Sequence, residues 1–249
     1  AAVSCAHRDG IIHRDLKPDN IVVLASGDGG EGSGRDLRVK VVGEGANLGL
    51  TQAGRIEVAR VGGRINTDAI DNSAGVDSSD HEVNIKILTG MAERAGKFDR
   101  PARDKLLASM TDEVAEHVLA HNYDQTLAVS LLEQDAVAEL ENHARFMSEL
   151  EAAGRLDRKV EGLPDATQML ELAAAGKGLT RPELAVLLAY GKLDLFDGIV
   201  ASKAPDDPAL EATLEAYFPQ PLAAYEGGMK RHRLRREIIA TVVDHELTN

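Results

Sequence analysis

Aromatic side chains are scarce in this sequence, and tryptophan is absent. Phe, Tyr and Trp together make up 3% of the 249 residues, whereas 43% are hydrophobic and 28% are charged. The two larger fractions are ordinary for folded domains, and the length is enough for one large domain or two small ones. A core of this composition must consist mainly of Leu, Ala, Val and Ile, which favours helices packed on helices over a β-sandwich.

Disulfide bonds and long apolar runs are missing as well. Cys5 is the only cysteine, which excludes an internal disulfide and fits a reducing cytosol. The longest apolar runs, residues 184–190 and 238–243, fall short of the roughly 18 residues of a membrane helix. The chain begins with Ala and has no signal-peptide pattern, so we interpret it as an internal fragment. We therefore expect a cytoplasmic location and no membrane partner.

Positive charge is in deficit, with 28 Lys and Arg against 41 Asp and Glu and a formal net charge of -13. This balance argues against a chain that coats nucleic acid or an anionic membrane. One basic segment, residues 230–236, is followed directly by the apolar residues Ile238 and Ile239. That order indicates a helix with one solvated basic turn, so we expect no nucleic-acid partner.

Helical patterns dominate the sequence beyond about Val83. The predicted helix starts share a capping residue followed by Pro or by acidic residues, as in the capping-box pattern of residues 180–183. The predicted helices cover residues 102–110 after Asp99, a segment from Thr111, a segment from Thr180, residues 207–217, and residues 232–247.

Two strand-like runs, residues 21–24 and 37–42, precede the helical part. Between them, residues 26–34 are Gly, Ser and acidic residues, which is typical of a flexible linker. The second run leads into Gly43-x-Gly45-x-x-x-Gly49, which taken alone is either a dinucleotide loop or a tight turn after a core strand. Further glycines up to Gly75 indicate loop-rich α/β structure.

Residues 41–84, VVGEGANLGLTQAGRIEVARVGGRINTDAIDNSAGVDSSDHEVN, closely resemble the large NAD-specific glutamate dehydrogenases of bacteria. The resemblance continues through RPELAVLLAYGKLDL, AYFPQPL and HRLRREIIATVV. It implies a mainly α chain with a small α/β part, in which the last strands of a Rossmann-type NAD domain precede a helical C-terminal domain. The implied layout places the end of the NAD-binding domain at residues 41–90 and the helical domain at residues 91–249.

The same resemblance implies three site residues. Glu44-Gly45-Ala46-Asn47 is similar to the family's EGAN element and residues 72–76 to its NAGGV element, which implies that Asn47 and Asn72 bind NAD near the nicotinamide. Ser79 falls where the family binds the substrate α-carboxylate. An Asn amide both donates and accepts hydrogen bonds, and a Ser hydroxyl can donate to a carboxylate without adding charge. Either Asn could instead be a turn residue, since Asn tolerates left-handed backbone.

The intact family oxidatively deaminates L-glutamate to 2-oxoglutarate and reduces NAD⁺, and we expect the full-length protein to be a homo-oligomer. The family's catalytic lysine and aspartate come from an upstream region that no segment of this sequence matches. The resemblance therefore implies a dehydrogenase fragment that is inactive alone. The alternative from another class is a non-catalytic helical module that packs within a larger oligomer.

Acidic residues gather around His81 in the sequence. They form a candidate metal cluster, but solvated or capping carboxylates are the commoner explanation, and we favour it. A general-base role for His81 is a further alternative that we do not favour. The acidic residues concerned are Asp68, Asp71, Asp77, Asp80 and Glu82.

Residues 13–20, HRDLKPDN, resemble the catalytic loop of Ser/Thr protein kinases. The resemblance implies that Asp15 accepts the proton of the substrate hydroxyl, that Lys17 approaches the transferred phosphate and that Asn20 holds Mg²⁺. A Ser/Thr kinase fragment is therefore a second alternative for the chain.

The other kinase motifs are missing from the sequence. Gly43-Glu44-Gly45 stands where a kinase has Asp-Phe-Gly, and neither the Gly-rich loop nor the strand lysine is present. We therefore interpret residues 1–40 as a non-functional, kinase-like fragment with a Gly/Ser-rich linker. Dehydrogenase-like sequence replaces it near residues 38–42.

Overall fold

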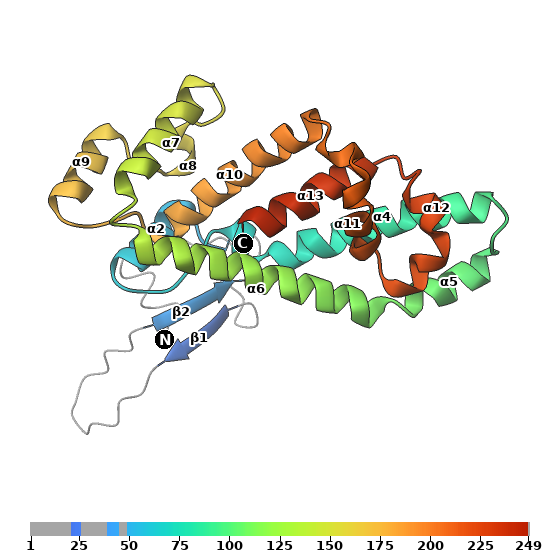
Figure 1. Ribbon diagram of the computed structural model, residues 1–249. Helices are drawn as coiled ribbons and strands as arrows, with labels where there is room; N and C mark the ends of the chain where they lie inside the picture. The colour runs from blue at the N-terminus through green and yellow to red at the C-terminus, as the bar shows by residue number, and fades with distance from the viewer. Residues whose placement is uncertain (1–20, 26–38, 45–48, 249) are drawn as a thin grey trace. The chain divides into compact units, whose positions relative to one another are not determined.

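The computed structural model describes residues 21–25, 39–44 and 49–248, and this part of the chain is mainly helical (Figure 1). Strands β1 (Ile21–Ala25) and β2 (Val39–Glu44) pair antiparallel, with Ile21 opposite Glu44 and Ala25 opposite Val39. Both strands agree with the apolar runs in the sequence. The pair is the one sheet among the described residues, so the parallel strands of a Rossmann-type domain are not seen there.

The helices begin largely where their capping residues predict. The Asp99 carboxylate accepts the Ala102 N–H at 2.9 Å, and the Glu183 carboxylate accepts the Thr180 N–H at 2.6 Å. The helices are α2 (Gln52–Arg60), α3 (Asp68–Asp71), α4 (Ser73–Arg94), α5 (Arg100–Ala108), α6 (Thr111–Asp135), α7 (Leu140–Ala152), α8 (Arg158–Glu161), α9 (Ala166–Ala174), α10 (Arg181–Ala201), α11 (Glu211–Tyr217), α12 (Glu226–Met229) and α13 (Arg235–Thr248). Short 3-10 segments are η2 (Ala204–Asp206), η3 (Pro208–Leu210) and η4 (Gln220–Tyr225).

The helical part begins earlier than the sequence pattern indicated. α2 begins at Gln52, three residues after Gly49, and α4 already includes Gly75, so the expectation of loop-rich structure up to Gly75 is wrong. The physical reason at α2 is a local cap: the Thr51 hydroxyl accepts the Gly54 N–H at 3.1 Å. Of the glycines near the end of α2, Gly62 has a positive φ of 88° and ends the helix.

The described residues form two compact units. Unit 1 combines the segment that ends at Ser73 with Thr126–Ala189, and unit 2 combines Ala74–Gln125 with Tyr190–Asn249. The unit boundaries therefore fall inside α6 and α10 as well as at the start of α4. No helix among the described residues is both long enough and apolar enough to cross a bilayer.

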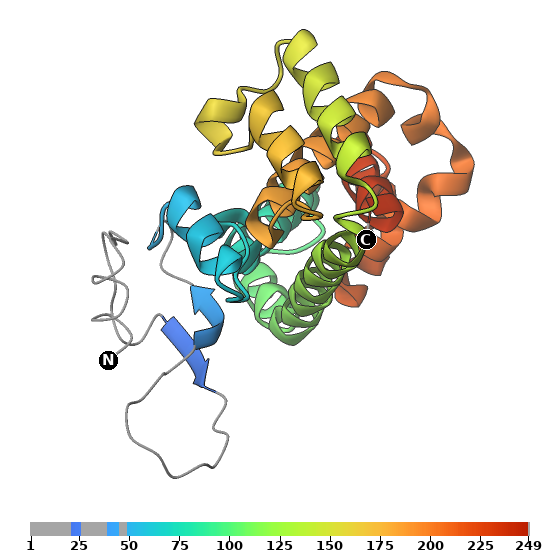
Figure 2. The ribbon, with the colours of Figure 1, turned by 90° about the vertical axis from the view of Figure 1, so that its left-hand side faces the viewer.

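Unit 1 has a small apolar centre and a helical group beside it. Ile70, Val129 and Ala185 are buried together. α7 and α9 contact each other, and with α8 they lie close together in both views (Figures 1 and 2). Gly178 approaches the backbone of Ala136 so closely that a Cβ at position 178 would lie 2.5 Å from the Ala136 carbonyl carbon. This contact requires glycine.

Unit 2 contains the larger core, to which α4, α11 and α13 contribute together with the η4–α12 segment and Met110, which lies in the turn between α5 and α6. Most of its side chains are aliphatic, as the composition predicts, although Tyr217 and Phe218 also take part. The buried residues of this core are Ile85, Leu88, Met110, Leu214, Tyr217, Phe218, Leu222, Met229, Ile238 and Ile239.

Candidate functional site

The structure describes two of the site residues that the sequence predicts. Asn72 belongs to unit 1 and Ser79 to unit 2. The other predicted residues, Asn47 and the kinase-like Asp15, Lys17 and Asn20, lie outside the described residues.

Asn72 ends helix α3. Its backbone N–H donates to the Asp68 carbonyl at 2.9 Å, and its φ of -112° is far from the left-handed region. The side chain is half-buried. Since the backbone here suits most residue types, the left-handed preference of Asn does not explain why Asn stands at this position.

A buried polar network surrounds the α3 turn. The Arg55 guanidinium, which is 1% exposed, donates to Asp71 Oδ2 at 2.8 Å and to the Asn66 carbonyl at 3.0 Å. Asn66 Nδ2 also donates to Asp71 Oδ1 at 2.9 Å. These contacts fix the carboxylate that immediately precedes Asn72.

Arg181, at the start of α10, extends this network within unit 1. Its Nε donates to Asn66 Oδ1 at 2.6 Å, its Nη1 to Glu133 Oε2 at 3.1 Å and its Nη2 to the Thr126 carbonyl at 2.9 Å. Sequence reasoning missed both Arg55 and Arg181. The partners of Arg181 lie 48 to 115 positions away in the chain, and Arg55 meets Asn66 and Asp71 11 and 16 positions away only once α2 and α3 are folded.

Ser79 is exposed in the second turn of α4. Its neighbour Asp80 accepts the Tyr217 hydroxyl at 2.8 Å, and that hydroxyl accepts Asn84 Nδ2 at 2.8 Å. Burial raises the pKa of Tyr217, so the phenol keeps its proton and remains a donor. The chain of hydrogen bonds fixes this part of α4 and leaves the Ser79 hydroxyl toward solvent.

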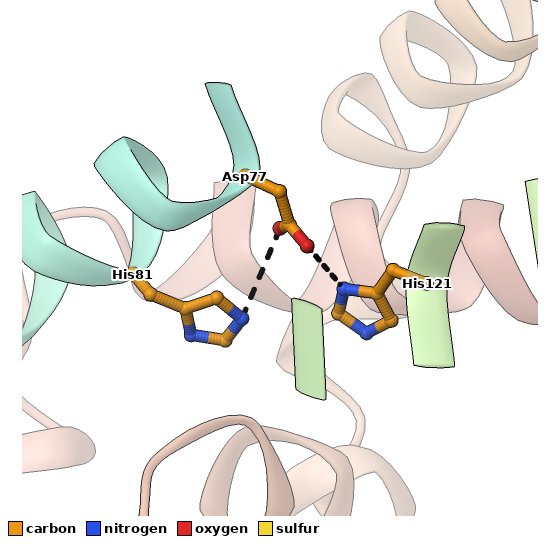
Figure 3. Close-up of side chains that lie close together, drawn as sticks. All are labelled: Asp77, His81 and His121. Atoms are coloured by element: carbon orange, nitrogen blue, oxygen red, sulfur yellow. Dashed lines mark hydrogen bonds and ion pairs between the residues drawn. The ribbon is translucent and has the colours of Figure 1, made fainter. Parts of the chain in front are cut away.

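One face of α4 in unit 2 carries an imidazole and carboxylate cluster (Figure 3). Asp77 Oδ2 lies 2.9 Å from His121 Nδ1 on α6, and Asp77 Oδ1 lies 3.9 Å from His81 Nε2. The ligand atoms of Asp77, His81 and His121 all lie within 4.8 Å of one another. Two further imidazole rings lie nearby. The ring centroid of His117 is 5.7 Å from that of His81, and the ring centroid of His245 is 4.6 Å from that of His121.

The two imidazoles of this cluster differ in their environments. His81 is 1% exposed, and its ring stacks on Tyr217 with centroids 4.6 Å apart. Burial lowers the pKa of His81, whereas the hydrogen bond to Asp77 raises the pKa of His121. Burial also raises the pKa of Asp77, but its imidazole neighbours outweigh burial, and the net pKa is lower than usual. At neutral pH, Asp77 is therefore charged and His81 is neutral.

The acidic residues near His81 in the sequence do not form a single site. Asp68 and Asp71 face Arg55, Asp80 accepts from Tyr217 and Glu82 pairs with Lys86. These four carboxylates serve as hydrogen-bond and ion-pair partners, and Asp71, whose side chain is 7% exposed, is buried rather than solvated. Asp77 differs, because its partners are His81 and His121.

Two family models match the chain. One, described as bacterial NAD-glutamate dehydrogenase, catalytic domain, matches residues 25–132, and the other, described as glutamate dehydrogenase, C-terminal, matches residues 176–249. The first match begins ahead of Val41, where the resemblance in the sequence begins, and the kinase-like residues 13–20 precede it.

Individual relatives agree with the family models. Three relatives are named NAD-specific glutamate dehydrogenase. The protein from Pseudomonas aeruginosa is 48% identical over a region that covers 89% of this chain, the one from Halomonas elongata 49% over 87%, and the one from Mycobacterium tuberculosis 45% over 86%. The chain spans only 14%, 14% and 13% of their lengths. No solved structure matches the chain.

Proposed function

We propose that the chain is a fragment of a bacterial NAD-specific glutamate dehydrogenase, an enzyme that oxidatively deaminates L-glutamate to 2-oxoglutarate with NAD⁺. The observation that carries this proposal is the 45–49% identity over most of the chain. In the proposal the fragment supplies binding residues, while the rest of the enzyme supplies the catalytic lysine and aspartate. A cytoplasmic homo-oligomer remains our expectation for the whole enzyme.

The layout belongs to the same proposal. Residues 41–90 would end the NAD-binding domain, in which β2 would be a late strand of the Rossmann-type sheet, and residues 91–249 would form the helical C-terminal domain. Residues 1–40 would be the non-functional kinase-like fragment. The family match begins at residue 25 and so overlaps residues 25–40, which this layout assigns to the kinase-like fragment.

Asn72 would hold the nicotinamide side of NAD. Its amide can donate to the carboxamide oxygen of the cofactor and accept from a ribose hydroxyl. Two observations support this role: the backbone of Asn72 does not need an Asn, and the Arg55–Asp71–Asn66 network fixes the turn that carries it. A side chain on such a rigid turn loses little conformational freedom when it binds a ligand.

Ser79 would donate to the α-carboxylate of glutamate. Its exposed position on α4 supports this role, because a substrate-binding hydroxyl must be reachable. The hydrogen bonds of the neighbouring Asp80 and Asn84 to Tyr217 keep this part of the helix in place. A hydroxyl is a suitable donor where added positive charge is not required.

Replacement of Ser79 by Ala in a full-length enzyme that contains this sequence should lower kcat/KM for glutamate about 10- to 150-fold, because a hydrogen bond to a charged group contributes about 1.5–3 kcal/mol. The KM for NAD should stay unchanged. Steady-state kinetics with glutamate and NAD varied separately are the measurement. Ser78→Ala at the neighbouring position is the control, since the Ser78 hydroxyl donates to the Ala74 carbonyl of its own helix. Unchanged KM and kcat for glutamate in the Ser79 variant would refute the assigned role.

This chain alone should bind NAD too weakly to detect at micromolar concentrations. Only nicotinamide-side residues are proposed here, and one or two neutral hydrogen bonds contribute about 0.5–1.5 kcal/mol each, roughly a tenfold gain in affinity apiece. Most dinucleotide affinity comes from a pyrophosphate site at a helix N-terminus and an acidic residue for the ribose. Calorimetric titration with NAD is the measurement, and a dissociation constant in the low micromolar range would contradict the expectation.

A further inference from the structure

Three potential metal ligands converge in unit 2. Asp77 and His81 stand four positions apart on α4, a spacing that places both side chains on one face of the helix. His121 reaches the same point from α6, and Figure 3 shows the two imidazoles on either side of the Asp77 carboxylate. All three ligand atoms lie within 4.8 Å of one another.

His81 is the observation that points to a ligand. It is almost completely buried, yet among the described residues neither of its ring nitrogens has a hydrogen-bond partner. Buried polar nitrogens normally have a partner, so each exception needs an explanation. The Nε2 atom points toward Asp77, and the 3.9 Å separation from Oδ1 is too long for a hydrogen bond.

The spacing suits a small cation with short bonds. Ligands about 2.1 Å from a tetrahedral zinc ion stand about 3.4 Å from one another. Asp77 Oδ2 lies 2.9 Å from His121 Nδ1 and Asp77 Oδ1 lies 3.9 Å from His81 Nε2, so these two separations bracket that value, and rotation of the carboxylate would bring one of its oxygens to the ion.

We propose that Asp77, His81 and His121 bind one zinc-like divalent transition-metal ion, with a water as the fourth ligand. Two imidazoles and one carboxylate favour Zn²⁺, Co²⁺ or Ni²⁺ over Mg²⁺ and Ca²⁺, which prefer all-oxygen sites. His81 is neutral and can offer a lone pair from Nε2. His121 can bind the ion through Nδ1 in the neutral tautomer whose proton is on Nε2. The exposed edge of His121 gives the ion a way in, since its side chain is 32% exposed.

The bound ion would clamp α4 to the first half of α6. Both helix segments belong to unit 2, and Ser79 lies between two of the ligands, Asp77 and His81, along α4. The ion would therefore stabilise the helix turn that carries Ser79 without touching it. The proposal does not depend on the dehydrogenase assignment, since its test measures metal binding and stability rather than activity.

The test is a calorimetric titration of the metal-free 249-residue chain with Zn²⁺ at neutral pH, compared with His81→Gln and His121→Gln. We expect one tight site per wild-type chain, with a dissociation constant of micromolar or below, and at least a tenfold weaker site in each variant. Zn²⁺ should also raise the melting temperature of the wild-type chain, because a ligand that binds only the folded state stabilises it. Mg²⁺ at the same concentration should not.

His143→Gln is the matched control, because it removes a histidine of α7 and leaves the cluster intact. Its Zn²⁺ affinity should equal that of the wild-type chain. If the His81→Gln chain does not fold, the Zn²⁺ affinity of the His121→Gln chain tests the proposal alone. The His121 side chain is partly exposed and therefore less important for packing than His81. A wild-type chain without a tight Zn²⁺ site, or a His121→Gln chain with unchanged affinity, would show that the cluster is only an ion pair.

Discussion

The free energy of unfolding should fall by about 3–5 kcal/mol when Arg55 is replaced by methionine. The Arg55 guanidinium donates to Asp71 at 2.8 Å and lies 3.6 Å from Asp68. The Asp71 side chain is only 7% exposed, so the variant leaves a buried carboxylate without its positive partner. Breaking a buried ion pair by removing one partner is strongly destabilising for this reason. Urea denaturation followed by circular dichroism measures the loss.

Arg60→Met is the control for this prediction. Arg60 stands on the same helix and pairs with Glu57 at 3.0 Å, but the two side chains are 53% and 62% exposed. An exposed ion pair of this kind contributes about 0–1 kcal/mol. Equal losses in the two variants would mean that the burial of Arg55 has no energetic consequence. A double variant, Arg55→Met with Asp71→Asn, should recover part of the stability because the uncompensated charge is gone.

The second large effect is expected at Leu222. This side chain is completely buried in the core of unit 2, although it lies in the short η4 segment, which the sequence did not predict. Leu222→Ala should lower the free energy of unfolding by about 2–5 kcal/mol, because the lost burial and the remaining cavity both destabilise the folded state. Leu119→Ala on α6 is the control: Leu119 is 67% exposed, and its loss should change stability by less than about 0.5 kcal/mol. A Leu222 variant as stable as the Leu119 variant would contradict the placement of η4 in the core.

Local signals in the sequence were sufficient for much of the helical fold. Asp99, Thr180 and Asp207 mark helix or 3-10 starts because capping depends on residues only two or three positions away. The start of α4 at Ser73 was missed, because Ser73, Gly75 and Asp77 have low helix propensity, which the tertiary context overrides. The same limit applies to η4 and α12, which are held by long-range burial of Leu222 and Met229.

The candidate site shows a sharper limit. Asn72 and Ser79 were predicted from a family resemblance, which no local sequence pattern could replace, and their roles stay predictions. His121 could not be assigned to the acidic residues around His81, because it lies 44 positions beyond Asp77 and meets it only when α4 and α6 fold. Arg181 was missed for the same reason, since Asn66 lies 115 positions before it.

The interleaved order of the two units has a consequence for synthesis on the ribosome. Unit 1 needs Arg181 to complete its polar network with Asn66 and Glu133, yet the intervening segment Ala74–Gln125 belongs to unit 2. That segment leaves the ribosome well before its own partner segment, Tyr190–Asn249, has been made. Apolar residues such as Leu88 and Met110 therefore stay exposed to solvent until the second segment of unit 2 has been synthesised. We therefore expect nascent chains halted before position 190 to expose apolar surface and to aggregate more readily than the 249-residue chain.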